Sequence, residues 1–120
     1  MKIISVILIG FVAIEHLYIL YVEMFAWSTT GRKIFRKFPS DLFEKTRLLA
    51  ANQGLYNGFL SAGLIWSLLI SNSEWSLNIA CFFLGCVITA GFYGGLTVSK
   101  SIFIKQAIPA ILALIASLIA

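Results

Sequence analysis

Three ionisable side chains lie inside one apolar stretch near the start of the chain, residues 3–27. Glu15 and His16 are adjacent, and Glu23 follows seven residues after His16. On a helix this spacing places His16 and Glu23 on one face, with Glu15 on its flank. An adjacent carboxylate and imidazole can share and exchange a proton, which is the basis of acid–base chemistry and of proton-coupled binding. Because ionisable groups are costly in lipid, we expect this helix to line a polar site.

The composition places this stretch in a membrane. Of the 120 residues, 60% are hydrophobic and 12% are charged, whereas soluble domains average roughly 25% charged residues. Four apolar blocks, at about 3–25, 48–70, 76–98 and 102–120, each approach the ~20 residues that a helix needs to cross ~30 Å of hydrocarbon. We predict an all-α fold, a four-helix transmembrane bundle that forms a single domain over residues 1–120.

Basic side chains are concentrated between the first two blocks. They are Arg32, Lys33, Arg36, Lys37, Lys45 and Arg47. The break after the third block holds Lys100, and the break at 71–74 has no Lys or Arg. Cytoplasmic loops are rich in Lys and Arg, so we predict that 28–47 is a basic cytoplasmic loop and that the chain is N-out and C-out. The net charge of +4 is then a signal of topology, and no nucleic-acid partner is expected.

Two interpretations of the basic loop stay open. It is either a solvated turn that only sets the topology, or residues 34–38, which mix apolar and basic side chains, lie on anionic lipid. Asp41 followed by Glu44 resembles a capping box, which predicts a helix start near Asp41.

Polar residues of the later blocks extend the expected site. At 1.5 Å per residue they lie in the cytoplasmic half of the membrane, while the outer half has almost none, which predicts a pocket closed by an apolar plug. The predicted ligand-binding residues are Glu15, His16, Glu23, Asn52, Gln53, Tyr56, Asn57, Tyr93 and Gln106. No catalytic residue, cofactor or metal is predicted, and Cys81 and Cys86 are interpreted as packing residues because a spacing of five separates them on a helix.

Small residues predict close helix packing. Gly54, Gly58 and Ala62 recur every four residues. We expect them on nearly the opposite side of the helix from a second cluster, which comprises Asn52, Gln53, Tyr56, Asn57 and Leu60. The face of small residues admits a neighbouring helix, either from the same chain or from a second subunit in a homodimer. Pro109 predicts a kink in the fourth helix.

Three segments, EHLYILYVEMFAW, NQGLYNGFLSAGL and FFLGCVITAGFYGG, carry a resemblance to a known family. The chain resembles, over essentially its whole length, the uncharacterised small integral membrane proteins labelled domain of unknown function 1304. The resemblance implies a multi-pass protein of the bacterial inner (cytoplasmic) membrane with four helices and no assigned activity. The matching residues are Glu15, His16, Tyr18, Glu23, Asn52, Gln53, Gly54, Tyr56, Asn57, Gly58, Gly91, Tyr93, Gly94 and Gln106.

Three functions are compatible with this inventory. The first is binding or transport of a small polar or cationic amphipathic ligand, with Glu15 and His16 exchanging a proton. The second is an accessory or structural membrane subunit whose Asn, Gln and Tyr side chains only hydrogen-bond helices together. The third is a membrane-embedded enzyme that isomerises a lipid or isoprenoid substrate by proton transfer.

Overall fold

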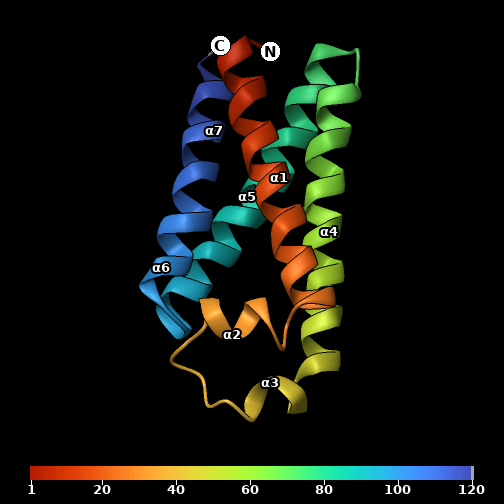
Figure 1. Cartoon of the computed structure of the whole chain (residues 1–120). Helices are drawn as coiled ribbons and strands as arrows, with labels where there is room; N and C mark the ends of the chain where they lie inside the picture. The colour runs from red at the N-terminus through yellow and green to blue at the C-terminus, as the bar shows by residue number, and fades with distance from the viewer. Residues whose placement is uncertain (120) are drawn as a thin grey trace. The chain divides into compact units, whose positions relative to one another are not determined.

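The computed structural model describes residues 1–119, and their regular structure is helical without strands (Figure 1). The all-α prediction is confirmed. In chain order the elements are α1 (Ile3–Phe25), α2 (Thr30–Ile34), α3 (Leu42–Lys45), α4 (Arg47–Leu69), α5 (Ser73–Thr97), α6 (Lys100–Ile102), the π-helical segment η1 (Phe103–Ala107) and α7 (Ile108–Leu118). The predicted end of the last span at Ala120 lies outside the described residues.

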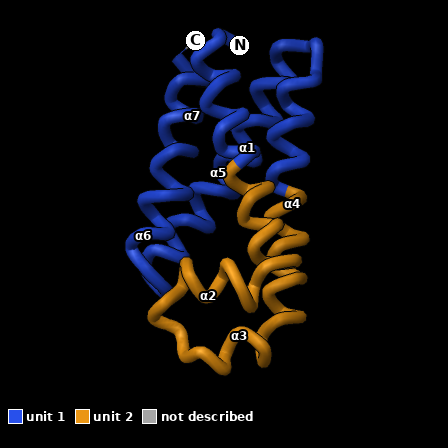
Figure 2. The backbone as a smooth tube through the Cα atoms, viewed as in Figure 1, with its two compact units in different colours: residues 1–14, 60–120 blue, residues 15–59 orange. Residues whose placement is uncertain are grey.

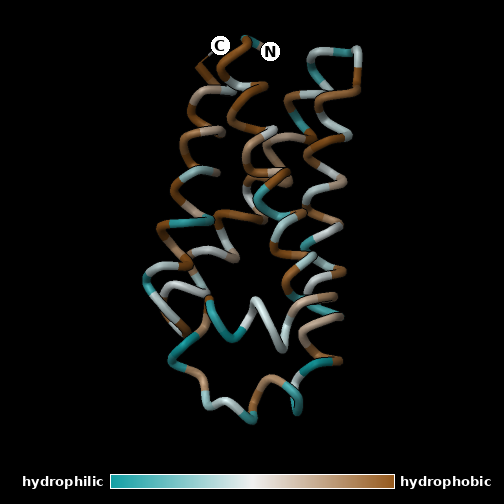
Figure 3. The backbone as a smooth tube through the Cα atoms, viewed as in Figure 1, coloured by the Kyte–Doolittle hydropathy of each residue, from teal (hydrophilic) through white to brown (hydrophobic). Residues whose placement is uncertain are grey.

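Three of these helical stretches are long and apolar enough to cross a membrane. They are Ile3–Phe25, Ser73–Thr97 and Lys100–Leu118, and Figure 3 shows brown, hydrophobic colour along much of α1 and α7. The helix α4 is as long as α1, with 23 residues, but its first half carries the polar residues Asn52, Gln53 and Asn57. The structure is therefore that of a membrane protein with three clearly apolar helices and a more polar long helix.

The chain forms two compact units (Figure 2). Unit 1 comprises Met1–Ile14 and Leu60–Ala120, and unit 2 comprises Glu15–Phe59. The helices α1 and α4 each contribute one part to each unit.

The core of unit 1 is apolar. Its buried members are Ile9, Val12, Ala13, Leu64, Ala80, Leu84, Val87, Ala110 and Ala113. Within this unit, the start of α1, the end of α7 and the turn between α4 and α5 lie at one end, while the turn between α5 and α6 lies at the other (Figure 1). The buried core residues of α7 are both alanines, Ala110 and Ala113, and such small side chains let helix backbones approach closely.

Glycines of α5 face the start of the last helix. A Cβ on Gly91 would lie 2.8 Å from both the backbone N and the Cβ of Ala107. One on Gly94 would lie 2.7 Å from Ile102, and one on Gly95 would lie 2.6 Å from Phe103. These distances are too short for a side chain, so glycine is required for this contact.

The last helix changes its winding before Pro109. The amide of Ile108 donates to the carbonyl of Phe103, five residues earlier, and Phe103–Ala107 is a π-helix. Proline cannot donate to the carbonyl of Lys105, and its ring crowds that carbonyl, so the preceding turn widens. The predicted effect of Pro109 thus takes the form of a π-helical turn.

The helix α5 begins three residues before the predicted start at 76. The side chain of Asn72 accepts a hydrogen bond of 3.0 Å from the amide of Trp75. This N-cap satisfies a free amide of the first turn, so the polar residues Ser73 and Glu74 belong to the helix.

Unit 2 contains a folded connection between α1 and α4. The Trp27 ring lies 5.6 Å from Phe35 and 5.1 Å from Phe43, whose side chain is 1% exposed. Trp27 Nε1 also donates to Thr46 Oγ1 at 3.0 Å. These contacts order much of the connection, which is not only a solvated turn.

The predicted capping box at Asp41 does not form. Asp41 itself has helical backbone angles and makes no side-chain capping bond. Its carboxylate instead accepts from Lys45 Nζ at 2.9 Å, one helical turn later. The capping bond fails because a cap requires extended backbone at its own position. The helix start predicted near Asp41 is confirmed, since α3 begins at Leu42, but α3 is a separate short helix and the long helix α4 begins at Arg47.

Candidate functional site

The ionisable residues of α1 are shielded to different degrees. The His16 side chain is fully buried at 0% exposure, and Glu15 and Glu23 are half-buried. All three belong to unit 2, where the second half of α1 and the first half of α4 are combined. His16 is therefore shielded inside the protein, and the role of Glu15, His16 and Glu23 in a ligand site stays a prediction.

A direct hydrogen bond joins α1 to α4. Asn57 Nδ2 donates to Glu23 Oε1 at 2.7 Å. The same nitrogen lies 3.2 Å from the carbonyl oxygen of Gln53, one turn earlier on α4. Asn57 is therefore held by its own helix while it binds the carboxylate of the other.

Two glycines bring the helices close enough for this bond. A Cβ on Gly54 would lie 2.7 Å from Met24 Cγ and 3.2 Å from the carbonyl oxygen of Leu20. One on Gly58 would lie 2.6 Å from Leu20 Cδ1. The predicted glycine face thus receives α1 of the same chain, while Ala62 is exposed. A homodimer through Gly54, Gly58 and Ala62 stays a prediction.

The expected separation of polar and small faces on α4 is wrong for one residue. Asn57 lies only about 60° around the helix from Gly54 at 100° per residue. It therefore shares the face that meets α1. The other polar residues of this stretch, Asn52, Gln53 and Tyr56, are exposed.

The two predicted site residues from the last helices belong to unit 1. Tyr93 on α5 is 70% exposed, and Gln106 in η1 is half-buried. Tyr93 lies along a shallow groove on α5 that also includes Cys81, Gly85 and Thr89. The Thr89 hydroxyl donates to the carbonyl of Gly85 at 2.8 Å, so this hydroxyl is satisfied within α5.

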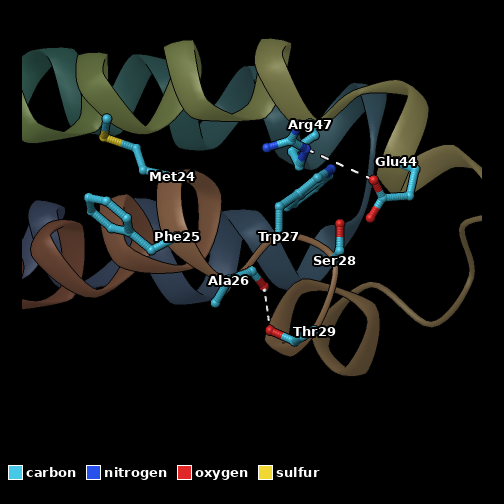
Figure 4. A pocket seen from close by; sticks show the side chains of 8 residues that line it. All are labelled: Met24, Phe25, Ala26, Trp27, Ser28, Thr29, Glu44 and Arg47. Atoms are coloured by element: carbon cyan, nitrogen blue, oxygen red, sulfur yellow. Dashed lines mark hydrogen bonds and ion pairs between the residues drawn. The ribbon is translucent and has the colours of Figure 1, made fainter.

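Sequence reasoning missed a hollow at the end of α1 (Figure 4). It measures about 370 Å³ and is lined by Met24, Phe25, Ala26, Trp27, Ser28, Thr29, Glu44 and Arg47. The indole of Trp27 extends toward Arg47, which pairs with Glu44 at 3.9 Å. The sequence feature that could have indicated this hollow is the change from apolar residues to Trp27, Ser28 and Thr29 where α1 ends.

Buried serines are a second feature that the sequence analysis missed. Ser61 Oγ donates to the carbonyl of Ala13 at 2.8 Å, and Ser76 Oγ donates to the carbonyl of Ser67 at 2.6 Å. Ser67 and Ser117 donate to carbonyls of their own helices. These four serines are small and hydrogen-bonded, which lowers the free-energy cost of burying them.

The described residues contain no group of three or more His, Cys, Asp or Glu side chains that could hold a metal ion. The described site groups are the carboxylates of Glu15 and Glu23 and the imidazole of His16. Asn57 supplies the amide that holds the Glu23 carboxylate.

An all-helical chain with three apolar helices that are long enough to cross a bilayer, and with acid, imidazole and amide side chains on two of its helices, is a small membrane protein. It belongs to the family described as protein of unknown function (DUF1304), whose model matches residues 10–118. It is similar to the uncharacterized protein YpaA of Lactococcus lactis subsp. lactis (strain IL1403), with 39% identity over 119 residues that cover 98% of each chain. No solved structure matches the chain. The family resemblance stated from the sequence is thus confirmed.

Proposed function

We propose that this protein crosses the bacterial cytoplasmic membrane four times and binds a small polar or cationic amphipathic molecule beside Glu23, with a proton exchanged at Glu15 and His16. The single observation that carries the proposal is the hydrogen bond of 2.7 Å from Asn57 to Glu23. It fixes a half-buried carboxylate between two helices, where a cationic group would find a partner in surroundings of low polarity.

The Glu23 carboxylate has capacity for a ligand. An ionised carboxylate offers about four acceptor positions, and Asn57 uses one of them through Oε1. A cation beside a partly desolvated carboxylate interacts far more strongly than it would in water. The half-buried state of Glu23 therefore supports a site that is both reachable and selective for positive charge.

The proposed proton-exchanging pair, Glu15 and His16, lies nearer the start of α1 than Glu23 does. His16 is seven residues from Glu23, about 10.5 Å along the axis at 1.5 Å per residue. A ligand cation near Glu23 lowers the affinity of neighbouring groups for protons through electrostatic repulsion. Binding and proton release are thereby coupled in the proposed mechanism.

The proposed topology makes α4 the fourth membrane span. Its 23 residues extend about 35 Å, enough to cross the hydrocarbon core. Part of its polar surface is satisfied by α1, since Asn57 binds Glu23 and Ser61 binds the Ala13 carbonyl. Internal hydrogen bonds of this kind make a moderately polar helix tolerable in lipid.

Binding of a defined lipophilic cation tests the proposal. We expect the purified protein in detergent to bind tetraphenylphosphonium in titration calorimetry and to release protons into a weakly buffered solution. Glu23→Gln keeps the shape and an acceptor for Asn57 but removes the charge, so affinity should fall at least tenfold. Glu15→Gln should abolish proton release.

The matched control is Glu74→Gln, because Glu74 is exposed at the start of α5. It should leave both affinity and proton release unchanged. No binding by the wild-type protein, or equal binding by the wild type and Glu23→Gln, would overturn the proposed function.

A structural role is the second candidate, and one specific feature favours it. Asn57 and Glu23, like Ser61 and the Ala13 carbonyl, link α1 to α4 by hydrogen bonds that need no ligand. For this accessory role, Asn57→Ala would lower the free energy of unfolding without any effect on a bound molecule, since it removes an intramembrane hydrogen bond and such bonds average ~0.6 kcal/mol.

A further inference from the structure

The basic connection between α1 and α4 carries more positive charge than its own acids neutralise. Its acidic residues are Asp41 and Glu44. Asp41 pairs with Lys45 at 2.9 Å and Glu44 with Arg47 at 3.9 Å. The remaining cations are Arg32, Lys33, Arg36 and Lys37, and no carboxylate pairs with them among the residues that the structure describes.

One of these cations has a structural role. Arg32 Nε donates to the carbonyl of Ser28 at 2.6 Å, and Nη1 donates to the carbonyl of Ser40 at 2.7 Å and to its hydroxyl. The guanidinium also lies 5.3 Å from the centroid of the buried Phe43 ring. Arg32 therefore closes the loop between α2 and α3, and it is not available as a freely moving charge.

The other three cations are presented outward by this scaffold. Lys33, Arg36 and Lys37 are exposed. Arg36 Nε donates to the carbonyl of Lys33 at 3.1 Å, and the ring of Phe35 stacks on Phe38 at 5.4 Å in the same segment. Ile34, between these cations, is 44% exposed. These residues form a small surface, the 33–37 surface, which combines three exposed cations with an exposed aliphatic side chain.

The place of this surface in the chain determines what it meets. The apolar helix α1 ends at Phe25, and α2 begins at Thr30. Lys and Arg within about 15–20 residues of the end of a membrane-crossing helix lie near the membrane surface, and the 33–37 surface falls inside this distance of Phe25. Cations near the membrane are attracted to anionic lipid, each by a factor of about five in affinity, and apolar side chains insert beside them.

We propose that the 33–37 surface binds the headgroups of anionic phospholipids, with Lys33, Arg36 and Lys37 contacting phosphates and Ile34 entering the interface. Charge complementarity and the position next to α1 both support this ligand. The inference shares with the proposed function only the membrane crossing of α1, and it does not involve Glu15, His16 or Glu23.

Lipid selectivity of the full-length protein in bilayers tests this proposal. The protein is reconstituted into phosphatidylcholine vesicles with trace spin-labelled phosphatidylglycerol or phosphatidylcholine, and the motionally restricted fraction of each label is measured. The affinity of the wild type for phosphatidylglycerol should exceed its affinity for phosphatidylcholine by about threefold or more. Salt at 1 M should weaken this preference because it screens exposed charges.

The decisive variant carries Lys33→Gln, Arg36→Gln and Lys37→Gln. We expect its preference for phosphatidylglycerol to fall close to one. The charge-preserving variant Lys33→Arg, Arg36→Lys and Lys37→Arg should retain the wild-type value, since it keeps the three positive charges.

A second control removes the same amount of charge elsewhere, through Lys2→Gln, Lys100→Gln and Lys105→Gln. It should retain most of the selectivity. Unchanged selectivity in the 33–37 glutamine variant, or an equal loss in both glutamine variants, would overturn the proposal. Unchanged selectivity in the 33–37 glutamine variant would indicate that this surface binds an acidic protein instead of lipid. Tetraphenylphosphonium binding by the same 33–37 variant separates this test from that of the proposed function, because that binding should not change.

Discussion

At the scale of single residues, the pairing of Asn57 with Glu23 defines the candidate site. Residue types and spacing place an acid and an imidazole on one side of α1, and the structure shows His16 buried and Glu23 half-buried. The pairing itself was not predictable, because depth along two helices does not determine which faces meet. The rotation of α4 is set by Gly54 and Gly58, and it turns Asn57 toward Glu23.

Replacing Asn57 tests whether this pair stabilises the fold. Asn57→Ala removes the amide that donates to Glu23 Oε1 and leaves a half-buried carboxylate with one partner fewer. We expect the free energy of unfolding to fall by about 1 kcal/mol, since interhelical hydrogen bonds in membranes are worth ~0.6 and at most about 1.7 kcal/mol. Reversible unfolding in mixed micelles, followed by circular dichroism, measures the change.

The control for this prediction is Asn52→Ala on the same helix. Asn52 is exposed, so its replacement should change the stability by less than about 0.5 kcal/mol. Equal effects of the two substitutions would show that the Asn57–Glu23 bond contributes nothing specific.

At the scale of helices, the sequence predicts length well and local geometry poorly. The first span is predicted at 3–25 and observed as Ile3–Phe25, and the second differs by one residue at each end. The first is a long apolar run, for which the number of residues needed to cross a bilayer is a strong constraint, and the second is equally long but more polar. The cap at Asn72 and the π-helical turn before Pro109 depend on individual hydrogen bonds, and the hydrophobic pattern does not encode them.

Glycine replacements should separate packed from open helix faces. A Cβ on Gly54 would approach Met24 Cγ to 2.7 Å and the Leu20 carbonyl to 3.2 Å, whereas a Cβ on Gly85 meets nothing within 4 Å. The flexible Met24 side chain can move, but the backbone of Leu20 cannot without shifting α1. We expect Gly54→Ala to destabilise the protein by about 1–3 kcal/mol, in the range for overpacking.

The matched substitution Gly85→Ala should be neutral or stabilising by up to about 1 kcal/mol, because alanine favours the helix. Thermal unfolding in one detergent under identical conditions compares the two variants. A Gly54→Ala protein as stable as Gly85→Ala would contradict the close approach of α1 and α4.

At the scale of the whole molecule, charge and burial are distributed unequally between the two units. Unit 1 has an apolar core with hydrogen-bonded serines such as Ser61 and Ser76. Unit 2 contains the acid and imidazole of α1 and the basic connection. The sequence did not predict these bonds, because a serine that donates to another helix has the same sequence context as one that donates to a carbonyl of its own helix.

The membrane topology gives the last prediction. In the proposed arrangement the connection 28–47 and the turn at 98–99 are cytoplasmic, and the turn at 70–72 is outside, which requires that α4 crosses the membrane. Single cysteines at exposed positions, Ser40→Cys, Ser71→Cys and Ser101→Cys, are introduced after Cys81→Ala and Cys86→Ala. An impermeant maleimide added to intact cells should label only Ser71→Cys, and permeabilised cells should show labelling of all three.

The same experiment distinguishes the alternative in which α4 does not cross. In that case positions 40 and 71 lie on one side of the membrane and position 101 on the other, because α5 is apolar enough to cross by itself. Labelling of Ser101→Cys but not Ser71→Cys in intact cells would therefore remove α4 from the membrane. The proposed site would then lose its low-polarity surroundings, since Asn57 lies on α4 and the Glu23 carboxylate would be solvated together with it. The selectivity of Glu23 for cations depends on those surroundings. A topology in which α4 does not cross the membrane would therefore contradict the proposed function as well.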